Sequence, residues 1–130
     1  MDAPLNWLAV LLAAASTFVI GGLWYSLLFA GPWQRAAGLS DEQLTTGSAR
    51  IFIGSFLLAL VMAASLAAFI GDAGFVFGVF AGAAAGLTFV AAAVGVTYLF
   101  ERRSLRLFAI NASFSVLSFT VMGAIIGALQ

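Results

Sequence analysis

The chain has 130 residues, 64% of them hydrophobic and 8% charged, and its formal net charge at pH 7 is zero. It contains no cysteine and no histidine, which argues against disulfides, zinc sites and most nucleophile or general-base chemistry. A balanced charge gives no indication of a nucleic-acid partner. We therefore expect no catalytic residue, no metal site and no cofactor, and we predict that the chain is not an enzyme.

Four stretches contain no charged residue: 3–34, 51–71, 73–100 and 107–130. Each can cross a bilayer, because a helix needs roughly 20 apolar residues to span the hydrocarbon. The chain is thus predicted to be an all-α integral membrane protein, a single domain over residues 1–130 with four transmembrane helices in one bundle. We expect these helices at about residues 5–30, 47–70, 74–100 and 105–129, with the lipid bilayer as the first partner.

The inner end of the first predicted span is rich in aromatic residues. Residues 21–33 read GGLWYSLLFAGPW, and Trp24, Tyr25 and Trp33 suit the headgroup region, where amphipathic rings settle. We call these three residues the aromatic corner. Pro32 is predicted to end the span or to turn the chain. The apolar run is too long for the core of a signal peptide and has no basic leader, so we expect it to be retained.

A short helix is predicted between the first two spans. Ser40 and Gln43 have the spacing of a capping box, in which each side chain accepts a hydrogen bond from the backbone amide of the other residue. Asp41 and Glu42 suit the positive end of such a helix. We expect it to lie on the cytoplasmic surface.

The third predicted span carries four glycines at intervals of four residues, the pattern known as a glycine zipper. We call Gly74, Gly78, Gly82 and Gly86 the glycine ladder. Without side chains, a partner backbone can approach closely, and dispersion contacts then supply an attraction that the hydrophobic effect cannot supply within apolar lipid. The ladder therefore predicts a helix-packing face, whose partner belongs either to the same chain or to a second copy. Gly123 and Gly127 form a shorter packing motif of the same kind in the fourth span.

The fourth predicted span also carries polar residues on one stripe. Asn111, Ser115, Ser118 and Met122 follow one another at spacings of four, three and four. A carboxamide in hydrocarbon is costly unless it is hydrogen-bonded, so this polar stripe is expected to face protein. Two interpretations stay open: the stripe holds the helices together, or it lines a small neutral cavity for a lipid or apolar ligand.

The orientation of the chain follows from its arginines, which lie beside the first and third connections only. Cationic loops are retained in the cytoplasm, so both termini are predicted to be extracytoplasmic in a multi-pass protein. The predicted topogenic residues are Arg35, Arg50, Arg102, Arg103 and Arg106. No acidic or basic residue lies in the middle of a span, which argues against ion-coupled transport. No proline lies inside a span, so the helices are predicted to be uninterrupted.

Three segments of the sequence are similar to a known family: NWLAV from Asn6, WYSLLFAGPW from Trp24, and ERRSLRLFAINASFSVLSFTVMGAIIGA from Glu101. They resemble the small bacterial membrane proteins of the domain of unknown function 1761. The resemblance covers nearly the whole chain. It implies a location in the bacterial inner membrane and a four-span fold, and it implies no reaction.

Two functions are compatible with the sequence. The first is a non-enzymatic binding or interaction module that acts through helix packing, with a second copy, a membrane-protein partner, or a lipid or apolar ligand. The alternative is a passive transporter or channel for a neutral small molecule, formed between protomers.

Overall fold

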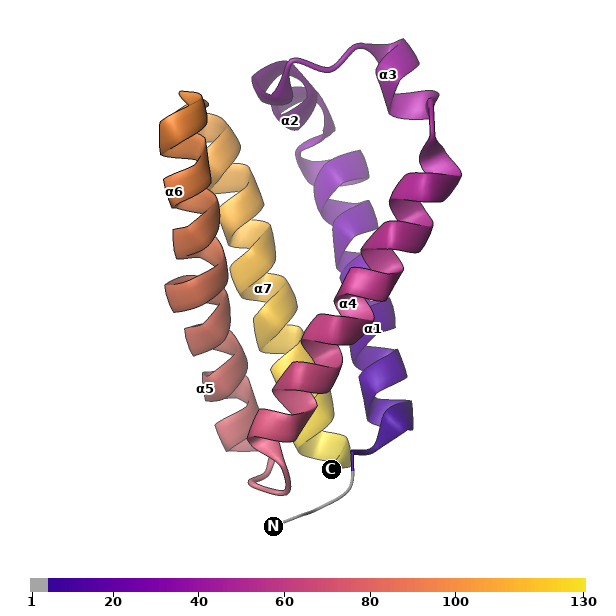
Figure 1. Ribbon diagram of the computed structural model, residues 1–130, viewed down its shortest axis with the longest axis vertical. Coiled ribbons are helices and arrows are strands. Elements are labelled where there is room, and N and C mark those ends of the chain that lie inside the picture. The colour runs from indigo at the N-terminus through magenta and orange to yellow at the C-terminus, as the bar shows by residue number, and fades with distance from the viewer. Residues whose placement is uncertain (1–4) are drawn as a thin grey trace.

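A computed structural model describes residues 5–130, and this part of the chain contains helices and no strand. Four helices are long and apolar enough to cross a membrane (Figure 1): Trp7–Leu28, Ser48–Ile70, Phe75–Glu101 and Leu105–Leu129. The prediction of an all-helical chain with four membrane-spanning segments is confirmed, and the chain is a multi-pass membrane protein. The first helix begins two residues later and ends two residues earlier than predicted, and the other bounds agree to within one residue.

Two of the four spans change their hydrogen-bonding pattern along their length. In the first, α1 (Trp7–Gly22) continues into the π-helix η1 (Leu23–Leu28). In the third, α5 (Phe75–Ala85) continues through the π-helix η2 (Gly86–Ala91) into α6 (Ala92–Glu101). The second span, α4 (Ser48–Ile70), and the fourth, α7 (Leu105–Leu129), are α-helical throughout. The prediction of uninterrupted helices missed the π-helices, because proline is only one cause of such a change.

Two short helices connect the first span to the second. Phe29 leaves the helical conformation at φ −127°, and α2 (Ala30–Ala37) begins directly after it, with Pro32 in its first turn. Proline is tolerated there because the first amides of a helix have no partner within the helix. The prediction that Pro32 ends or turns the chain did not reveal that a separate helix starts at this point.

The second short helix, α3 (Asp41–Thr45), has the capping box that its sequence predicts. The backbone amide of Gln43 donates to Ser40 Oγ at 3.1 Å, and the backbone amide of Ser40 donates to Gln43 Oε1 at 2.8 Å. All five residues of α3 are exposed. The polar segment thus satisfies its own amides without packing against the long helices.

The hydrophobic core lies between α1, α4 and α7, toward the end of the molecule that holds the described termini (Figure 1). The buried residues of α4 begin only at Ala59, and α2 and α6 contribute none. α7 contacts every other long helix. The core residues are Val10, Ala13, Ala14, Ala59, Ala63, Leu66, Ala67, Ile70, Phe119, Met122 and Ile126. Packing is therefore tight at one end of the spans and looser at the other.

Side-chain hydrogen bonds close the tightly packed end. Gln130 Nε2 donates to the carbonyl oxygens of Ala67 at 3.1 Å and Gly71 at 2.8 Å, at the end of α4. Gln130 Oε1 accepts from the backbone amide of Asn6 at 3.0 Å. The Asn6 carboxamide in turn donates to the carbonyl of Leu129 and caps α1 by accepting from two of its backbone amides. The ends of three spans are thus joined by two side chains.

The glycine ladder contacts α7 of the same chain. A Cβ atom on Gly82 would overlap the carbonyl oxygen of Phe119, and one on Gly78 would overlap that of Gly123. A Cβ on Gly86 would lie 3.0 Å from the Cα of Val116, which is tighter than nine in ten real Cβ contacts. These glycines therefore allow α5, η2 and α7 to pack with their backbones in contact.

Gly74 differs from the rest of the ladder. It lies outside the helix, as the N-cap of α5, with φ at +99°. The prediction of four ladder glycines within one helix is therefore wrong at this position. A glycine is favoured there because the backbone conformation is one that L side chains rarely adopt, and its carbonyl oxygen would lie 2.6 Å from a Cβ on Gly127.

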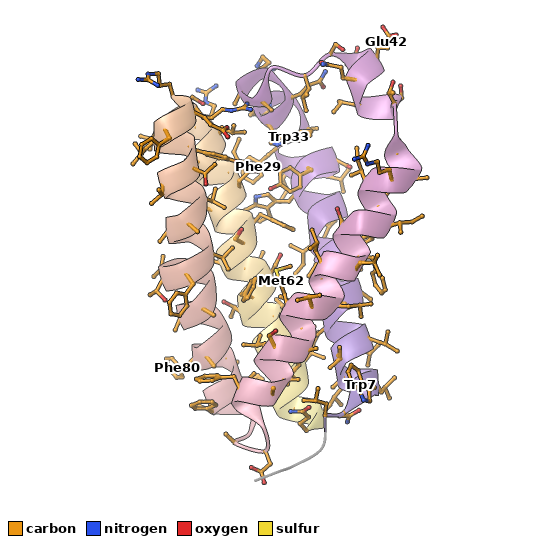
Figure 2. The ribbon with its side chains drawn as sticks, in the orientation of Figure 1. Trp7, Phe29, Trp33, Glu42, Met62 and Phe80 are labelled. Atoms are coloured by element: carbon orange, nitrogen blue, oxygen red, sulfur yellow. The ribbon has the colours of Figure 1, made fainter. Side chains whose placement is uncertain are left out.

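All five arginines lie at the end of the molecule opposite the described termini. Arg35 is in α2, Arg50 is in the first turn of α4, and Arg102, Arg103 and Arg106 surround the connection between α6 and α7 (Figure 1). Figure 2 shows Trp7 at the other end of the molecule from Trp33 and Glu42. We call the end that carries the arginines the basic end.

Candidate functional site

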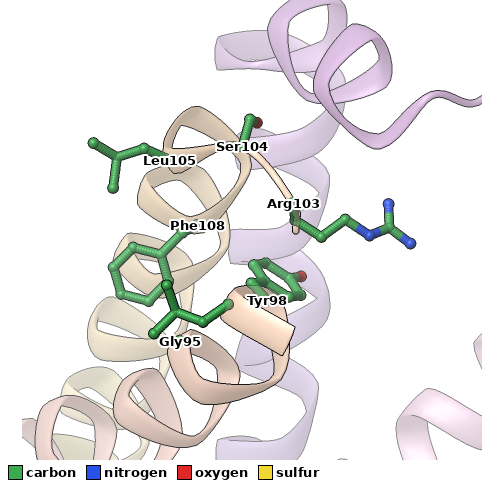
Figure 3. A pocket seen from close by; sticks show the side chains of 7 residues that line it. Gly95, Tyr98, Arg103, Ser104, Leu105 and Phe108 are labelled. Carbon is green, nitrogen blue, oxygen red and sulfur yellow. The ribbon is translucent and has the colours of Figure 1, made fainter. Parts of the chain in front are cut away.

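Two adjoining depressions lie at the basic end, away from the main cluster of core residues. The inner hollow has a volume of about 260 Å³ and lies between α2 and the facing ends of α6 and α7; it is lined by Trp33, Ala37, Leu39, Tyr98, Arg103, Leu107 and Asn111. The outer groove, also about 260 Å³, runs between α6 and α7; it is lined by Gly95, Tyr98, Leu99, Arg103, Ser104, Leu105 and Phe108 (Figure 3). Tyr98 and Arg103 line both.

A chain of hydrogen bonds joins three spans beside the inner hollow. The Tyr25 hydroxyl donates to Asn111 Oδ1 at 2.6 Å, and Asn111 Nδ2 donates to the Tyr98 hydroxyl oxygen at 2.7 Å. One carboxamide thus binds a tyrosine from the first span and another from the third. Because the Tyr98 hydroxyl accepts in this chain, its own proton remains available to a ligand.

The π-helix η1 places two consecutive aromatic residues against α7. The Trp24 indole Nε1 donates to the carbonyl oxygen of Ile110 at 3.0 Å, and Tyr25 reaches the next residue, Asn111. Successive side chains diverge less around the wider turn of a π-helix than around an α-helical turn, so both can face the same neighbour. The Tyr25 ring also lies edge-on to Trp33 and Phe114, with centroid distances of 5.2 and 5.1 Å.

The aromatic corner is therefore divided between two environments. Trp33 lines the inner hollow. Trp24 and Tyr25 make polar contacts with α7 instead, which the prediction of a headgroup location did not include.

Of the polar stripe, only Asn111 borders the inner hollow. The Ser115 hydroxyl donates to the carbonyl of Asn111 within its own helix, at 3.0 Å. Ser118 is buried, and its hydroxyl has no hydrogen-bond partner among residues 5–130. Met122 is fully buried in the core.

Arg103 is the one predicted topogenic arginine that lines the depressions. Its Nε donates to Glu101 Oε1 at 3.2 Å and its Nη1 donates to the carbonyl oxygen of Ala37 at 3.4 Å. Arg102 instead donates to the carbonyl of Phe100 in its own helix and lines neither depression. The arginines thus differ in their surroundings, although all five were predicted to have the same topogenic role.

Tyr98 is the central residue of the site that the sequence analysis did not select. The sequence does contain a signal for this residue. Tyr98 and Asn111 are separated from Ser104, the N-cap of α7, by almost the same number of residues. In an antiparallel pair of helices, residues equally distant from the turn lie at the same depth. Pairing polar residues across this turn would have identified the contact.

The side chains at the two depressions offer hydrogen-bond donors and one positive charge, and no carboxylate lines either of them. The remaining lining residues are mainly apolar. Among residues 5–130, no group of three or more histidine, cysteine, aspartate or glutamate residues is placed to hold a metal ion. The arrangement suits the binding of a molecule with a polar or anionic part and an apolar part.

Comparison with known proteins gives one match. The sequence model of the family described as "Protein of unknown function (DUF1761)" matches residues 8–127, a range that includes every residue of both depressions. No curated protein and no solved structure is significantly similar to the chain.

Proposed function

Because the chain belongs to the DUF1761 family, whose description gives no function, we propose a function from its own residues: a non-enzymatic membrane protein that binds a small amphiphile at the basic end. The polar part of the ligand occupies the inner hollow. Binding needs no reaction, and no step is assigned to any residue.

One observation supports this proposal above the others. Tyr98, Asn111 and Arg103 converge on a hollow whose other walls include Ala37, Leu39 and Leu107. A depression in which a few polar groups meet apolar side chains is the usual form of a ligand site. Asn111 is already oriented by its bonds to two tyrosines, so little conformational freedom is lost when a ligand binds.

We further propose that the protein lies in the bacterial inner membrane with its basic end in the cytoplasm and both termini outside. The gathering of all five arginines at one end supports this orientation, because cationic segments are retained in the cytoplasm. The ligand site then lies at the depth of the cytoplasmic headgroups, and α3 is a surface helix on that side.

The test compares two alanines in α2. Ala37 lines the inner hollow and Ala36 does not. The wild-type protein, Ala37→Phe and Ala36→Phe are purified in native lipid particles, and the co-purifying small molecules are identified by mass spectrometry. We expect a compound that is present with the wild type and with Ala36→Phe and depleted at least fivefold with Ala37→Phe. Equal recovery from the three proteins would contradict ligand binding in the hollow.

Self-association, or association with another membrane protein, is a further part of the proposal. The glycine ladder is occupied by α7, so such contacts would use other surfaces. The outer faces of α1 and α4 are available, with Leu8, Val19, Leu58 and Val61 each more than 60% exposed. Crosslinking in native lipid particles would report the association.

The alternative function is a passive pathway for a neutral small molecule between protomers. It is favoured by the absence of Asp, Glu, Lys and Arg from the central part of every span. A flux of neutral solutes above that of empty liposomes would support this alternative, and a binding protein would give no such flux.

A further inference from the structure

We infer that the ligand is an anionic membrane lipid, whose headgroup binds Arg103 and Tyr98 and whose acyl chain lies in the outer groove. This inference rests on the proposed function and gives it a ligand class. It follows from the donors left free at the two shared residues, from the apolar walls of the groove, and from the position of the groove at the end of two membrane spans.

Arg103 keeps most of its donors free. A guanidinium has five N–H groups, and Arg103 uses one for Glu101 and one for Ala37. The ion pair with Glu101 is open to solvent, with the two side chains 42% and 51% exposed, so it competes weakly with a ligand. Three N–H groups therefore remain for the oxygens of a phosphate, and charge-assisted bonds of this kind are among the strongest in proteins.

Tyr98 adds a neutral donor beside this cation. Its hydroxyl oxygen accepts from Asn111 at 2.7 Å, and among residues 5–130 the hydroxyl proton has no acceptor. No carboxylate lines either depression, and residues 101–106 carry three arginines against one glutamate. The local charge therefore favours an anionic headgroup over a zwitterionic or neutral one.

The outer groove explains why the anion is part of a lipid. Leu99 and Leu105 are each 80% exposed, and they line the groove together with Phe108 and Gly95. Figure 3 shows Arg103 extending to one side of the α6–α7 connection and Leu105 and Phe108 on the other. Because the groove lies at the end of two membrane spans, its apolar walls face the acyl chains of the bilayer, so an anion that reaches Arg103 and Tyr98 from this side is the headgroup of a lipid.

The absence of a side chain at Gly95 keeps the groove open. A Cβ there would lie 3.0 Å from the ring of Phe108, which lines the groove, so a larger residue would have to push that ring aside by at least a few tenths of an ångström. Each depression has a volume of about 260 Å³, close to the lower limit of the usual ligand pocket of about 300–1,000 Å³, and the two share Tyr98 and Arg103. One molecule that occupies both, with its polar part at the two shared residues, makes the best use of the site.

The test is a lipid competition with a charge-matched control. Full-length protein is equilibrated in mixed micelles with equal amounts of phosphatidylglycerol and phosphatidylcholine, and native mass spectrometry counts the lipids that stay bound. The variants are Arg103→Gln and Arg102→Gln, which remove the same charge from the same connection, only one of them from the site. Tyr98→Phe removes the hydroxyl and keeps the ring, and glycerol phosphate without acyl chains is added in a separate arm.

We expect the wild type to retain phosphatidylglycerol over phosphatidylcholine and Arg103→Gln to lose about tenfold in this retention, the effect of one charge-assisted contact. Arg102→Gln should behave as the wild type, Tyr98→Phe should lie between the two, and glycerol phosphate should not compete. Equal losses for the two arginine variants would overturn the inference, because the effect would then come from diffuse charge.

Two further outcomes would overturn the lipid class. Equal retention of the two lipids would exclude an anionic headgroup, and competition by glycerol phosphate would indicate a soluble anion. In either case the proposed function survives if Ala37→Phe still releases the bound compound from native lipid particles. If no compound depends on Ala37, the proposed function fails as well.

Discussion

At the scale of single residues, Asn111 links three spans by hydrogen bonds. Its carboxamide accepts from Tyr25 and donates to Tyr98, so one side chain of α7 is bonded to the first and third spans. The sequence indicated that this group needs a partner, because an unpaired carboxamide in hydrocarbon is costly. The identity of the partners depends on η1 and on the α6–α7 turn, and neither is encoded at Asn111 itself.

Replacing Asn111 by leucine should destabilise the fold. The change removes two hydrogen bonds between helices, each worth about 0.6–2 kcal/mol in a membrane protein, so we expect a loss of about 1–4 kcal/mol. The measurement is reversible unfolding in mixed micelles of increasing denaturing detergent. Ser113→Ala is the control, since that hydroxyl is exposed and bonds only within its own helix. Equal stability of the two variants would mean that the hydrogen-bond chain adds nothing to the fold.

At the scale of elements, the contact between α5 and α7 depends on missing side chains. The spacing of the glycine ladder predicted a close approach of two backbones, and it left open whether the partner came from the same chain. A GxxxG pattern describes one surface only, and the choice of partner depends on how the short turns align the spans. The structure brings Gly78 and Gly82 against α7, whose own Gly123 makes room for them.

Adding one methyl group should therefore disturb this contact. Gly82→Ala places a Cβ against the backbone of Phe119, which has no flexible end that could move away. We expect a loss of about 1–3 kcal/mol, the usual cost of overpacking. Gly54→Ala in α4 is the matched control, because nothing lies within 4 Å of its added Cβ, and it should be at least as stable as the wild type, since alanine is favoured over glycine inside a helix. If the Gly82→Ala protein is as stable as Gly54→Ala, the close backbone contact between α5 and α7 does not contribute to the stability of the fold.

The elements also show how far the sequence can predict the fold. The four spans were predicted to within two residues at each end, because charged connections and uncharged stretches directly reflect the cost of placing charge in hydrocarbon. The capping box of α3 was predicted because it involves only neighbouring residues. The π-helices and α2 were not predicted, because their formation depends on contacts with α7 and on the exact point at which the first span ends.

The candidate site was predicted less completely than the fold. Asn111, Trp33 and Arg103 were selected from the sequence, but each for a different reason and none as a member of a common site. Tyr98 was missed because a tyrosine at the end of a span is normally an interface residue. The shared site becomes visible only when α2, α6 and α7 are brought together in space.

At the scale of the whole molecule, the orientation in the membrane decides which compartment the ligand site faces. The chain has no cysteine, so single cysteines can report it without background. Asp72→Cys places a thiol in the exposed turn between α4 and α5, and Glu42→Cys places one in α3 at the basic end. We expect a membrane-impermeant maleimide to label Asp72→Cys in intact cells and Glu42→Cys only after lysis. The reverse pattern would place the basic end outside the cell.

The position of α7 in the chain has a consequence for assembly. α7 contacts every other long helix and contributes Phe119, Met122 and Ile126 to the core, yet it follows the other three spans in sequence. During synthesis, α1 and α4 can pair as soon as both are inserted, while the glycine face of α5 stays bare until α7 arrives. A ribosome that stalls between the third and fourth spans would therefore leave an incompletely packed intermediate in the bilayer, with the glycine face of α5 exposed. Membrane quality-control proteases would encounter the protein in this state.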